Sequence, residues 1–186
     1  VLIKFLKANI IGDNKNKIIA VYSIKYPGDK VPIAFLGRLY IDVLEKSGDR
    51  YVVKYEQELT SDDKLELLSD VELESSNLLD INNDGVQEIK IDYKSDNAIG
   101  LDKQKVAILQ WRGKSFGIIW QQIVHLNMDN YGRLQEKDKQ NYDATFKFVK
   151  TDRDYSDIVV KKLISKEGGV VMSPPRAEIQ TYKFNG

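Results

Sequence analysis

The chain of 186 residues contains no cysteine and a single histidine, His125. Without cysteine it has no disulfide, no thiolate metal site and no cysteine nucleophile. One histidine gives no support to a catalytic triad. We interpret His125 as a hydrogen-bonded residue at the end of a strand. The sequence also lacks Walker-type and dinucleotide-binding glycine loops, so we expect a protein that is not an enzyme.

An excess of charge of one sign is lacking too. The 28 Lys and Arg residues balance the 28 Asp and Glu residues, so electrostatics give no case for nucleic acid or an anionic membrane as the partner. No apolar run approaches the roughly 18–20 residues of a membrane span. Hydrophobic residues make up 42% of the chain, which predicts one folded domain over residues 1–186. A chain that opens on Val1 fits removal of a signal or lipoprotein leader, with a lipid anchor upstream, or a trimmed start.

Similar patterns recur three times along the sequence. Residues 40–55 and 106–120 each read as a strand, a glycine turn, an aromatic residue and a second strand, whereas residues 180–186 match only the first arm and the turn. A polar loop that leads into a strand precedes each pattern. We therefore define three tentative units, which cover residues 8–59, 77–122 and 142–186. The predicted fold is all-β and mainly antiparallel, with about three β-propeller-blade-like units in an incomplete propeller or a stack of sheets.

Three segments do not fit this pattern. Ser61 to Asp70 begins with a candidate helix N-cap and has leucines at helical spacing, which is consistent with a short helix or an extended connection. Met128 to Asn141 is rich in Lys, Asp, Gln and Asn, and predicts a solvated loop or one short helix. Pro174-Pro175 follows Gly168-Gly169, and we interpret the two pairs together as a linker. One or two short helices are therefore expected.

The most specific motif is the loop from Asp80 to Glu88. It places side-chain oxygens at its positions 1, 3, 5 and 9, on Asp80, Asn82, Asp84 and Glu88, with Gly85 at position 6. Alternate residues of a tight turn point inward, and Ca²⁺ takes roughly 6–8 oxygen ligands. Without a cation the three carboxylates repel one another. The pattern therefore predicts a Ca²⁺ site.

An EF-hand is excluded, because Ile91 occupies position 12, where that loop needs a bidentate acid, and a strand pattern follows where a helix is required. The alternative is a metal-free hairpin turn at Asn83-Asp84-Gly85, for which Asp-Gly is a strong signal. A turn alone does not account for Asp80, Asn82 and Glu88.

The run Asp80-x-Asn82-x-Asp84-Gly85-x-x-Glu88-Ile89, followed by a β-hairpin, resembles the FG-GAP and VCBS calcium-loop repeats. The resemblance implies that the carbonyl of Val86 is a further ligand beside the four side chains. It also implies a bladed antiparallel sheet and an extracytoplasmic location, secreted or on a bacterial cell surface. The likeness is strong only over residues 77–93, and a closed propeller usually needs four or more blades.

Two other loops carry weaker versions of the motif. In the third unit, Asp152, Asp154 and Asp157 are candidates for a second ion, but no glycine follows and the spacing is shorter. In the first unit, Asp13, Asn14 and Asn16 remain, with two lysines, Lys15 and Lys17, in the same loop.

Three aromatic residues complete the candidate functional residues: Trp111, Phe116 and Trp120. On a hairpin they either stack against a sugar ring or fill the space between packed sheets, and the second is the better interpretation. The expected function is non-catalytic: an extracytoplasmic calcium-binding module that binds a protein or a cell-wall glycan. The alternative is a small carbohydrate-active or other hydrolytic domain with a structural calcium. The 28 acidic residues offer many carboxylate pairs for such chemistry, and no pair stands out.

Overall fold

A computed structural model describes residues 2–13, 15–26, 36–59, 70–96, 100–132, 134–151 and 156–183. These residues form eleven strands and one short 3-10 turn, η2 (Glu136–Asp138). The strands are β1 (Leu2–Ala8), β2 (Lys17–Tyr26), β3 (Leu36–Ser47), β4 (Arg50–Glu58), β5 (Asp70–Leu79), β6 (Glu88–Asp96), β7 (Asp102–Trp111), β8 (Phe116–Asn127), β9 (Gln140–Val149), β10 (Asp157–Glu167) and β11 (Val170–Tyr182). The all-β prediction is confirmed.

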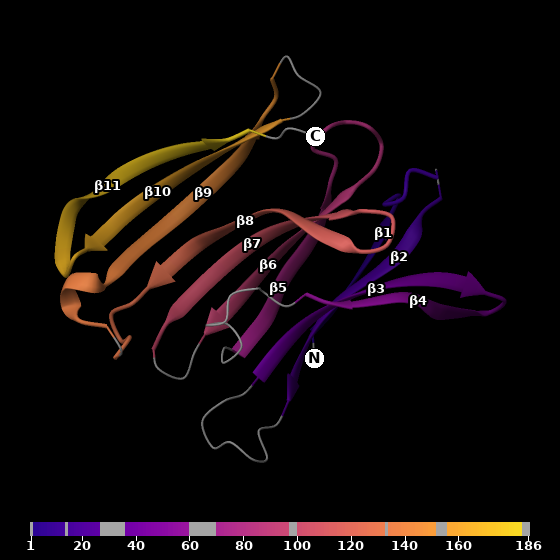
Figure 1. Ribbon diagram of the computed structural model, residues 1–186, viewed down its shortest axis with the longest axis horizontal. Coiled ribbons are helices and arrows are strands. Elements are labelled where there is room, and N and C mark those ends of the chain that lie inside the picture. The colour runs from indigo at the N-terminus through magenta and orange to yellow at the C-terminus, as the bar shows by residue number, and fades with distance from the viewer. Residues whose placement is uncertain are drawn as a thin grey trace.

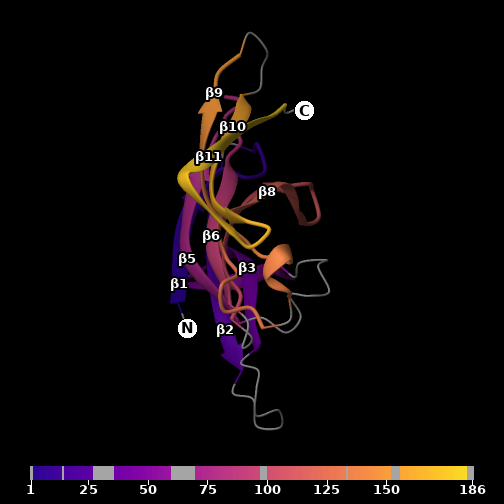
Figure 2. The ribbon, with the colours of Figure 1, turned by 90° about the vertical axis from the view of Figure 1, so that its left-hand side faces the viewer.

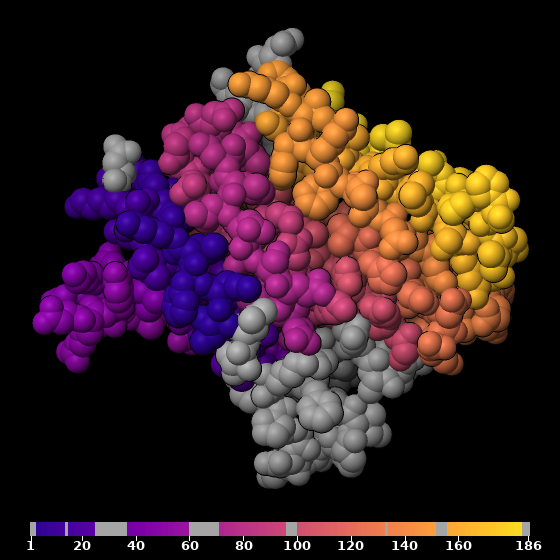
Figure 3. All heavy atoms as spheres, turned by 180° about the vertical axis from the view of Figure 1, so that it is seen from behind, coloured from indigo at the N-terminus to yellow at the C-terminus, as the bar shows by residue number. Residues whose placement is uncertain are grey.

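Within each sheet the strands pair in chain order, and every pairing is antiparallel. Strands β1–β4 form a four-stranded sheet, and β5–β11 form a seven-stranded sheet. The sheets are spread across the view of Figure 1, and the molecule is much narrower when turned by 90° (Figure 2). In Figure 3 the colours run from indigo and purple at one end to yellow at the other, so the strands are arranged in chain order.

The seven-stranded sheet bends sharply between β8 and β9. Only two residue pairs, His125↔Asp143 and Leu126↔Tyr142, connect these strands. Beyond them β9–β11 turn across a face of β7 and β8, where Trp120 lies against Phe146, with ring centroids 5.1 Å apart. The chain therefore contains three strand groups in packing terms: β1–β4, β5–β8 and β9–β11.

Two cores lie on opposite faces of the middle group. On one face, Ala107 and Leu109 of β7 join the first core, which includes Ile19, Val21 and Ile41 of the four-stranded sheet. On the other face, Val106 and Ile108 join the second core with Ile158 and Val160 of β10. Successive residues of a strand point to opposite faces, so a strand buried on both sides has a continuous apolar run. Residues 106–109 of β7 form such a run.

Both predicted hairpin turns are confirmed. β3 and β4 turn at Gly48, and β7 and β8 turn after Arg112, whose N–H donates to the Ser115 carbonyl at 2.8 Å. The linker prediction was wrong. Gly168 and Gly169 form the turn between β10 and β11, and Pro174 and Pro175 lie within β11. Because β11 is an edge strand and its pairing with β10 is irregular near the prolines, their missing N–H groups cost no regular ladder bond.

The helix expectations are met only by η2, which lies inside the segment 128–141. Residues 61–69 fall outside the described part of the chain, and Asp70 begins β5. Within the described residues, no helix is long and apolar enough to cross a membrane.

We expect Ile41→Ala, in the first core, and Ile108→Ala, in the second, each to lower the free energy of unfolding by about 2–5 kcal/mol, because both side chains are fully buried. Val53→Ala is the matched control, since Val53 is 51% exposed, and it should cost less than about 0.5 kcal/mol. Urea unfolding monitored by tryptophan fluorescence measures all three. Losses equal to that of the control would show that these faces are not packed as described.

Candidate metal centre

The predicted calcium loop connects β5 to β6. The corresponding connection in the first strand group is residues 9–16, and in the third group it is residues 150–156. The three loops are joined directly. The Gln87 N–H donates to the Asn9 carbonyl at 2.8 Å, and the Ser156 N–H donates to the Ile81 carbonyl at 3.1 Å. The middle loop therefore lies where all three strand groups meet.

Side chains of the loop fold back onto its own backbone. Asp80 Oδ2 accepts the Gly85 N–H at 3.1 Å, and Asp84 Oδ1 accepts the Val86 N–H at 2.7 Å. Asn82 Nδ2 donates to Asp84 Oδ2 at 2.8 Å. Asn82 and Asp84 are therefore in direct contact, and Asp80 bonds to the backbone of the same turn.

The reversal of the chain uses two residues with positive φ, Asn83 at 54° and Gly85 at 79°. The sequence predicted this conformation at the glycine. Asparagine is the other residue that adopts it readily, because its short polar side chain can bond locally.

Glu88, the fourth predicted side chain, lies beneath the loop and is only 1% exposed. Its Oε2 accepts the Ile81 N–H at 3.2 Å, and its Oε1 accepts Gln110 Nε2 at 3.3 Å. Burial raises the pKa of the Glu88 carboxyl above its ordinary value, the two hydrogen bonds lower it, and the charge of Asp84 raises it further. Glu88 is thus a buried carboxylate held by neutral donors.

The donor set of this loop contains only oxygen, as Ca²⁺ requires. Asp80 and Asp84 lie on the exposed side, whereas Glu88 is turned into the protein. Within the described residues, no three His, Cys, Asp or Glu side chains lie close enough together to hold a metal ion. The residue types fit Ca²⁺, and Glu88 is the buried member of the set.

The first-unit loop carries its own cation. Asp13 Oδ1 accepts the Lys15 N–H at 2.9 Å, and Asp13 Oδ2 lies 3.5 Å from Lys17 Nζ. The Lys15 hydrogen bond is the main reason that the pKa of Asp13 is below its ordinary value. Lys17 also contacts Glu45 at 3.3 Å. Asn16 is exposed in the same loop, and Asn14 is outside the described residues. Lys17 thus supplies a positive charge beside Asp13 in this loop.

The third-unit loop lies only partly within the described residues. Asp152 and Asp154 lie outside the described residues, and Asp157 is the first residue of β10. The second-ion hypothesis stays a prediction.

The aromatic residues belong to the cores. Phe116 is 4% exposed and Trp120 is 6% exposed, and Trp111 packs against the first core with its ring 5.1 Å from that of Phe116. Trp120 lies in the second core, on the other side of the sheet. In this conformation the three rings do not form a stacking surface for a sugar, because other side chains cover Phe116 and Trp120.

His125 lies near the end of β8, as expected, and is hydrogen-bonded. Its Nδ1 is 2.6 Å from Asp143 Oδ1 on β9, and its Nε2 is 3.7 Å from Asp102 Oδ2 on β7. Because His125↔Asp143 is one of the two residue pairs that connect β8 to β9, this contact lies at the bend of the sheet.

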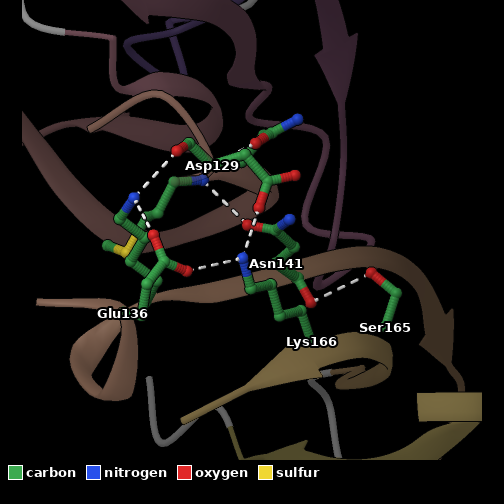
Figure 4. Close-up of polar contacts among 8 residues, drawn as sticks. Asp129, Glu136, Asn141, Ser165 and Lys166 are labelled. Atoms are coloured by element: carbon green, nitrogen blue, oxygen red, sulfur yellow. Dashed lines mark hydrogen bonds and ion pairs between the residues drawn. The ribbon is translucent and has the colours of Figure 1, made fainter. Parts of the chain in front are cut away.

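The sequence did not predict an ionic network in the connection between β8 and β9 (Figure 4). Lys166 Nζ of β10 contacts Asp129 Oδ1 at 2.7 Å and Glu136 Oε2 at 3.1 Å. Lys139 Nζ contacts Glu136 Oε1 at 2.5 Å and donates to the Asp129 carbonyl at 2.8 Å. The lysine contacts lower the pKa values of both acids. The segment 128–141, for which the sequence predicted a solvated loop or one short helix, is therefore bound to β10 by ion pairs.

No protein-family model, curated protein or solved structure matches this chain. The likeness to FG-GAP and VCBS repeats rests on the loop residues and stays a prediction.

We expect Glu88 to make the metal-free protein less stable as pH rises. A carboxyl with a raised pKa in the folded state binds more protons folded than unfolded, so its stabilising effect is full below the unfolded value and is lost as pH rises through the folded value. The loss should begin near pH 4.5, the ordinary value for glutamate. Urea unfolding with chelator over this range measures it.

Glu88→Gln keeps an oxygen acceptor for the Ile81 N–H and cannot ionise, so this part of the pH dependence should disappear. Asp13→Asn is the control, and it should leave the fall in stability in place. Equal slopes for the wild type and Glu88→Gln would contradict the assignment.

Proposed function

We propose that the protein is a non-catalytic, extracytoplasmic β-module in which Ca²⁺ bound by residues 80–88 stabilises the junction of three blade-like strand groups. The observation that carries the proposal is the position of the loop. The loop is hydrogen-bonded to the first group through Asn9 and to the third through Ser156. An ion that orders this loop would therefore stabilise both inter-group contacts at once.

The contacts to the first group are the more extensive. Asn9 donates its backbone N–H to Gln87 Oε1 at 3.2 Å and its side-chain Nδ2 to the Gly85 carbonyl at 3.0 Å. Together with the bond from the Gln87 N–H, these hydrogen bonds connect Asn9, which follows β1 of the four-stranded sheet, to the loop that precedes β6 of the seven-stranded sheet. Asn9 also accepts the Gly12 N–H at 3.1 Å, which fixes the first loop to the same point.

The charges of the middle loop support an ion there. Asp80, Asp84 and Glu88 bring three carboxylates to a turn of nine residues, and no lysine lies within that turn, in contrast to the first-unit loop. Asp80, Asn82, Asp84, Glu88 and the Val86 carbonyl are the oxygens that would hold the ion. When bound, Ca²⁺ would supply positive charge that offsets their repulsion and the desolvation of Glu88.

A protein partner is favoured over a glycan. The aromatic rings that would stack on a sugar are buried or packed against the core, whereas apolar side chains are exposed on the outer strands β1 and β11. One cavity among the described residues lies between the two sheets and is lined by Leu39, Leu59, Ile91, Tyr93, Ala107, Leu109 and Ile118. None of these residues is a carboxylic acid.

The proposal predicts that Ca²⁺ raises the midpoint of thermal unfolding of protein first treated with chelator. At a free concentration about 100 times the dissociation constant, binding should add about 2.7 kcal/mol. Asp84→Asn should abolish most of this gain, because it keeps an acceptor for the Val86 N–H but removes one carboxylate. Differential scanning calorimetry with and without Ca²⁺ makes the measurement.

Asp13→Asn is again the matched control, since Asp13 is already paired with Lys17. It should keep the full response to Ca²⁺. Mg²⁺ at the same concentration should have a smaller effect, because it demands stricter octahedral geometry. A wild-type protein whose midpoint does not move would reduce residues 80–88 to a metal-free turn and remove the proposed function.

A further inference from the structure

The two outer strand groups each have one face turned away from the cores. In the four-stranded sheet, Leu6 and Ile19 point to the first core and are cross-strand partners, so the neighbouring pair Phe5↔Ala20 lies on the opposite face. In β10, Ile158 and Val160 point to the second core, so Val159 and Lys161 lie opposite. Figures 1 and 3 place β3–β4 and β10–β11 at opposite ends of the molecule. We call the two outer surfaces the first face and the last face.

The register gives the composition of the first face. Three rows of cross-strand neighbours run from β1 to β4: Ile3–Tyr22–Tyr40–Glu58, Phe5–Ala20–Asp42–Glu56 and Lys7–Ile18–Leu44–Val53. Ile3 is 47% exposed and Phe5 is 65% exposed. The first two rows are therefore apolar at the β1 edge and acidic at the β4 edge, with two tyrosines between them. The third row adds a lysine at the β1 edge and an exposed valine at the β4 edge.

Asp42 lies within this face and has a carboxylate oxygen without a partner. The residue is only 8% exposed; its Oδ2 accepts the Tyr22 hydroxyl at 3.2 Å, and its Oδ1 has no hydrogen bond among the described residues. The nearby cation Arg38 is already paired with Glu58 at 2.5 Å. A buried acceptor left unpaired is costly, so a donor brought by another molecule would be favourable here.

The last face has the complementary arrangement. Its rows, from β9 to β11, are Lys147–Val159–Thr181, Thr145–Lys161–Ile179 and Asp143–Leu163–Ala177. Ile179 is 72% exposed and Leu163 is 42% exposed. Both lysines are exposed, and Asp143, the acid in these rows, contacts His125. The last face is therefore apolar towards the β11 edge and carries the exposed Lys147 and Lys161 on β9 and β10, with Asp157 at the start of β10 on the same face.

We propose that the last face of one copy of this protein docks on the first face of a second copy. Placed face to face, the apolar β11 edge meets the apolar β1 edge, and Lys147 and Lys161 meet the side that carries Asp42 and Glu56. Such stacking continues the mode of packing inside the chain, where β5–β8 lie between the other two strand groups. Because two different faces are used, the contact is heterologous and produces a ring or an open chain of copies.

The test uses two variants that each block one face. Phe5→Asp places a charge on the first face, and Ile179→Asp places one on the last face; both native side chains are mostly exposed, so folding should be unaffected. Analytical ultracentrifugation over a concentration series should show assembly of the wild type and monomers for each variant alone. A one-to-one mixture should form a dimer, because each variant retains the face that the other lacks.

Ile11→Asp is the control, since Ile11 is 44% exposed in the first-unit loop, outside both faces, and assembly should persist. Circular dichroism melting verifies that all three variants fold. A wild type that stays monomeric at its highest soluble concentration would overturn the proposal. The first face would then be a candidate binding site for a different protein. Loss of assembly with Phe5→Asp alone would indicate symmetric pairing of first faces, and this also overturns it. Calcium binding is measured separately, so either proposal can fail without the other.

Discussion

The burial of β7 on both of its faces is the constraint on which the rest of the structure depends. Ala107 and Leu109 pack towards the four-stranded sheet, and Val106 and Ile108 pack towards β9–β11. Removing either outer group would expose one side of this apolar run to water, at a cost that grows with the area uncovered. The three groups are therefore not independent domains. They depend on their neighbours in the way that stacked repeats do, since each layer completes the core of the next.

This layering also explains why Glu88 is buried. Ile89 must face the first core, so Glu88, one residue earlier, lies on the side of the second. There the third strand group approaches, and its Ser156 N–H bonds to the Ile81 carbonyl above Glu88. A carboxylate at such a position is expensive unless it is satisfied. The hydrogen bonds from Ile81 and Gln110 satisfy it in part, and the loop keeps two further carboxylates close by. The acidic residues of the loop thus lie where the three strand groups contact one another.

Much of the strand pattern could be predicted from the sequence, because hairpins with glycine turns and alternating side chains are local signals. Gly48 and Gly113 mark their turns, and the run after Gly85 is a strand. Which residues meet between the layers could not be predicted, because these contacts join positions far apart in the chain, such as Asn9 and Gln87. For the same reason Lys166 was not recognised as the partner of Asp129. Pro174 and Pro175 misled because proline signals a break in a central strand but is tolerated on an edge.

For the candidate site, Gly85 predicted the reversal of the loop, but the spacing of oxygens did not predict the direction of Glu88. That direction is set by the alternation of β6 and by Gln110 on β7. The aromatic residues show the same limit. Trp111 and Trp120 lie on either arm of one hairpin, yet they enter different cores, since they point to opposite faces of the sheet. Sequence position alone does not distinguish a ring that fills a core from one that meets a ligand.

A stack of sheets has two outer faces, and the composition of each face reflects what it contacts. Inward positions of the four-stranded sheet are aliphatic, as in Ile19, Val21 and Ile41. The outward positions beside them include Tyr22 and Tyr40, which stack with ring centroids 5.4 Å apart, and Asp42. Tyrosine suits a surface that is alternately wet and covered, because its ring is apolar and its hydroxyl can bond to water or protein. An end designed only for solvent would not need an apolar edge at Phe5 next to a carboxylate that is nearly out of reach of water. The first face therefore has the composition that the proposed docking of a second copy would use.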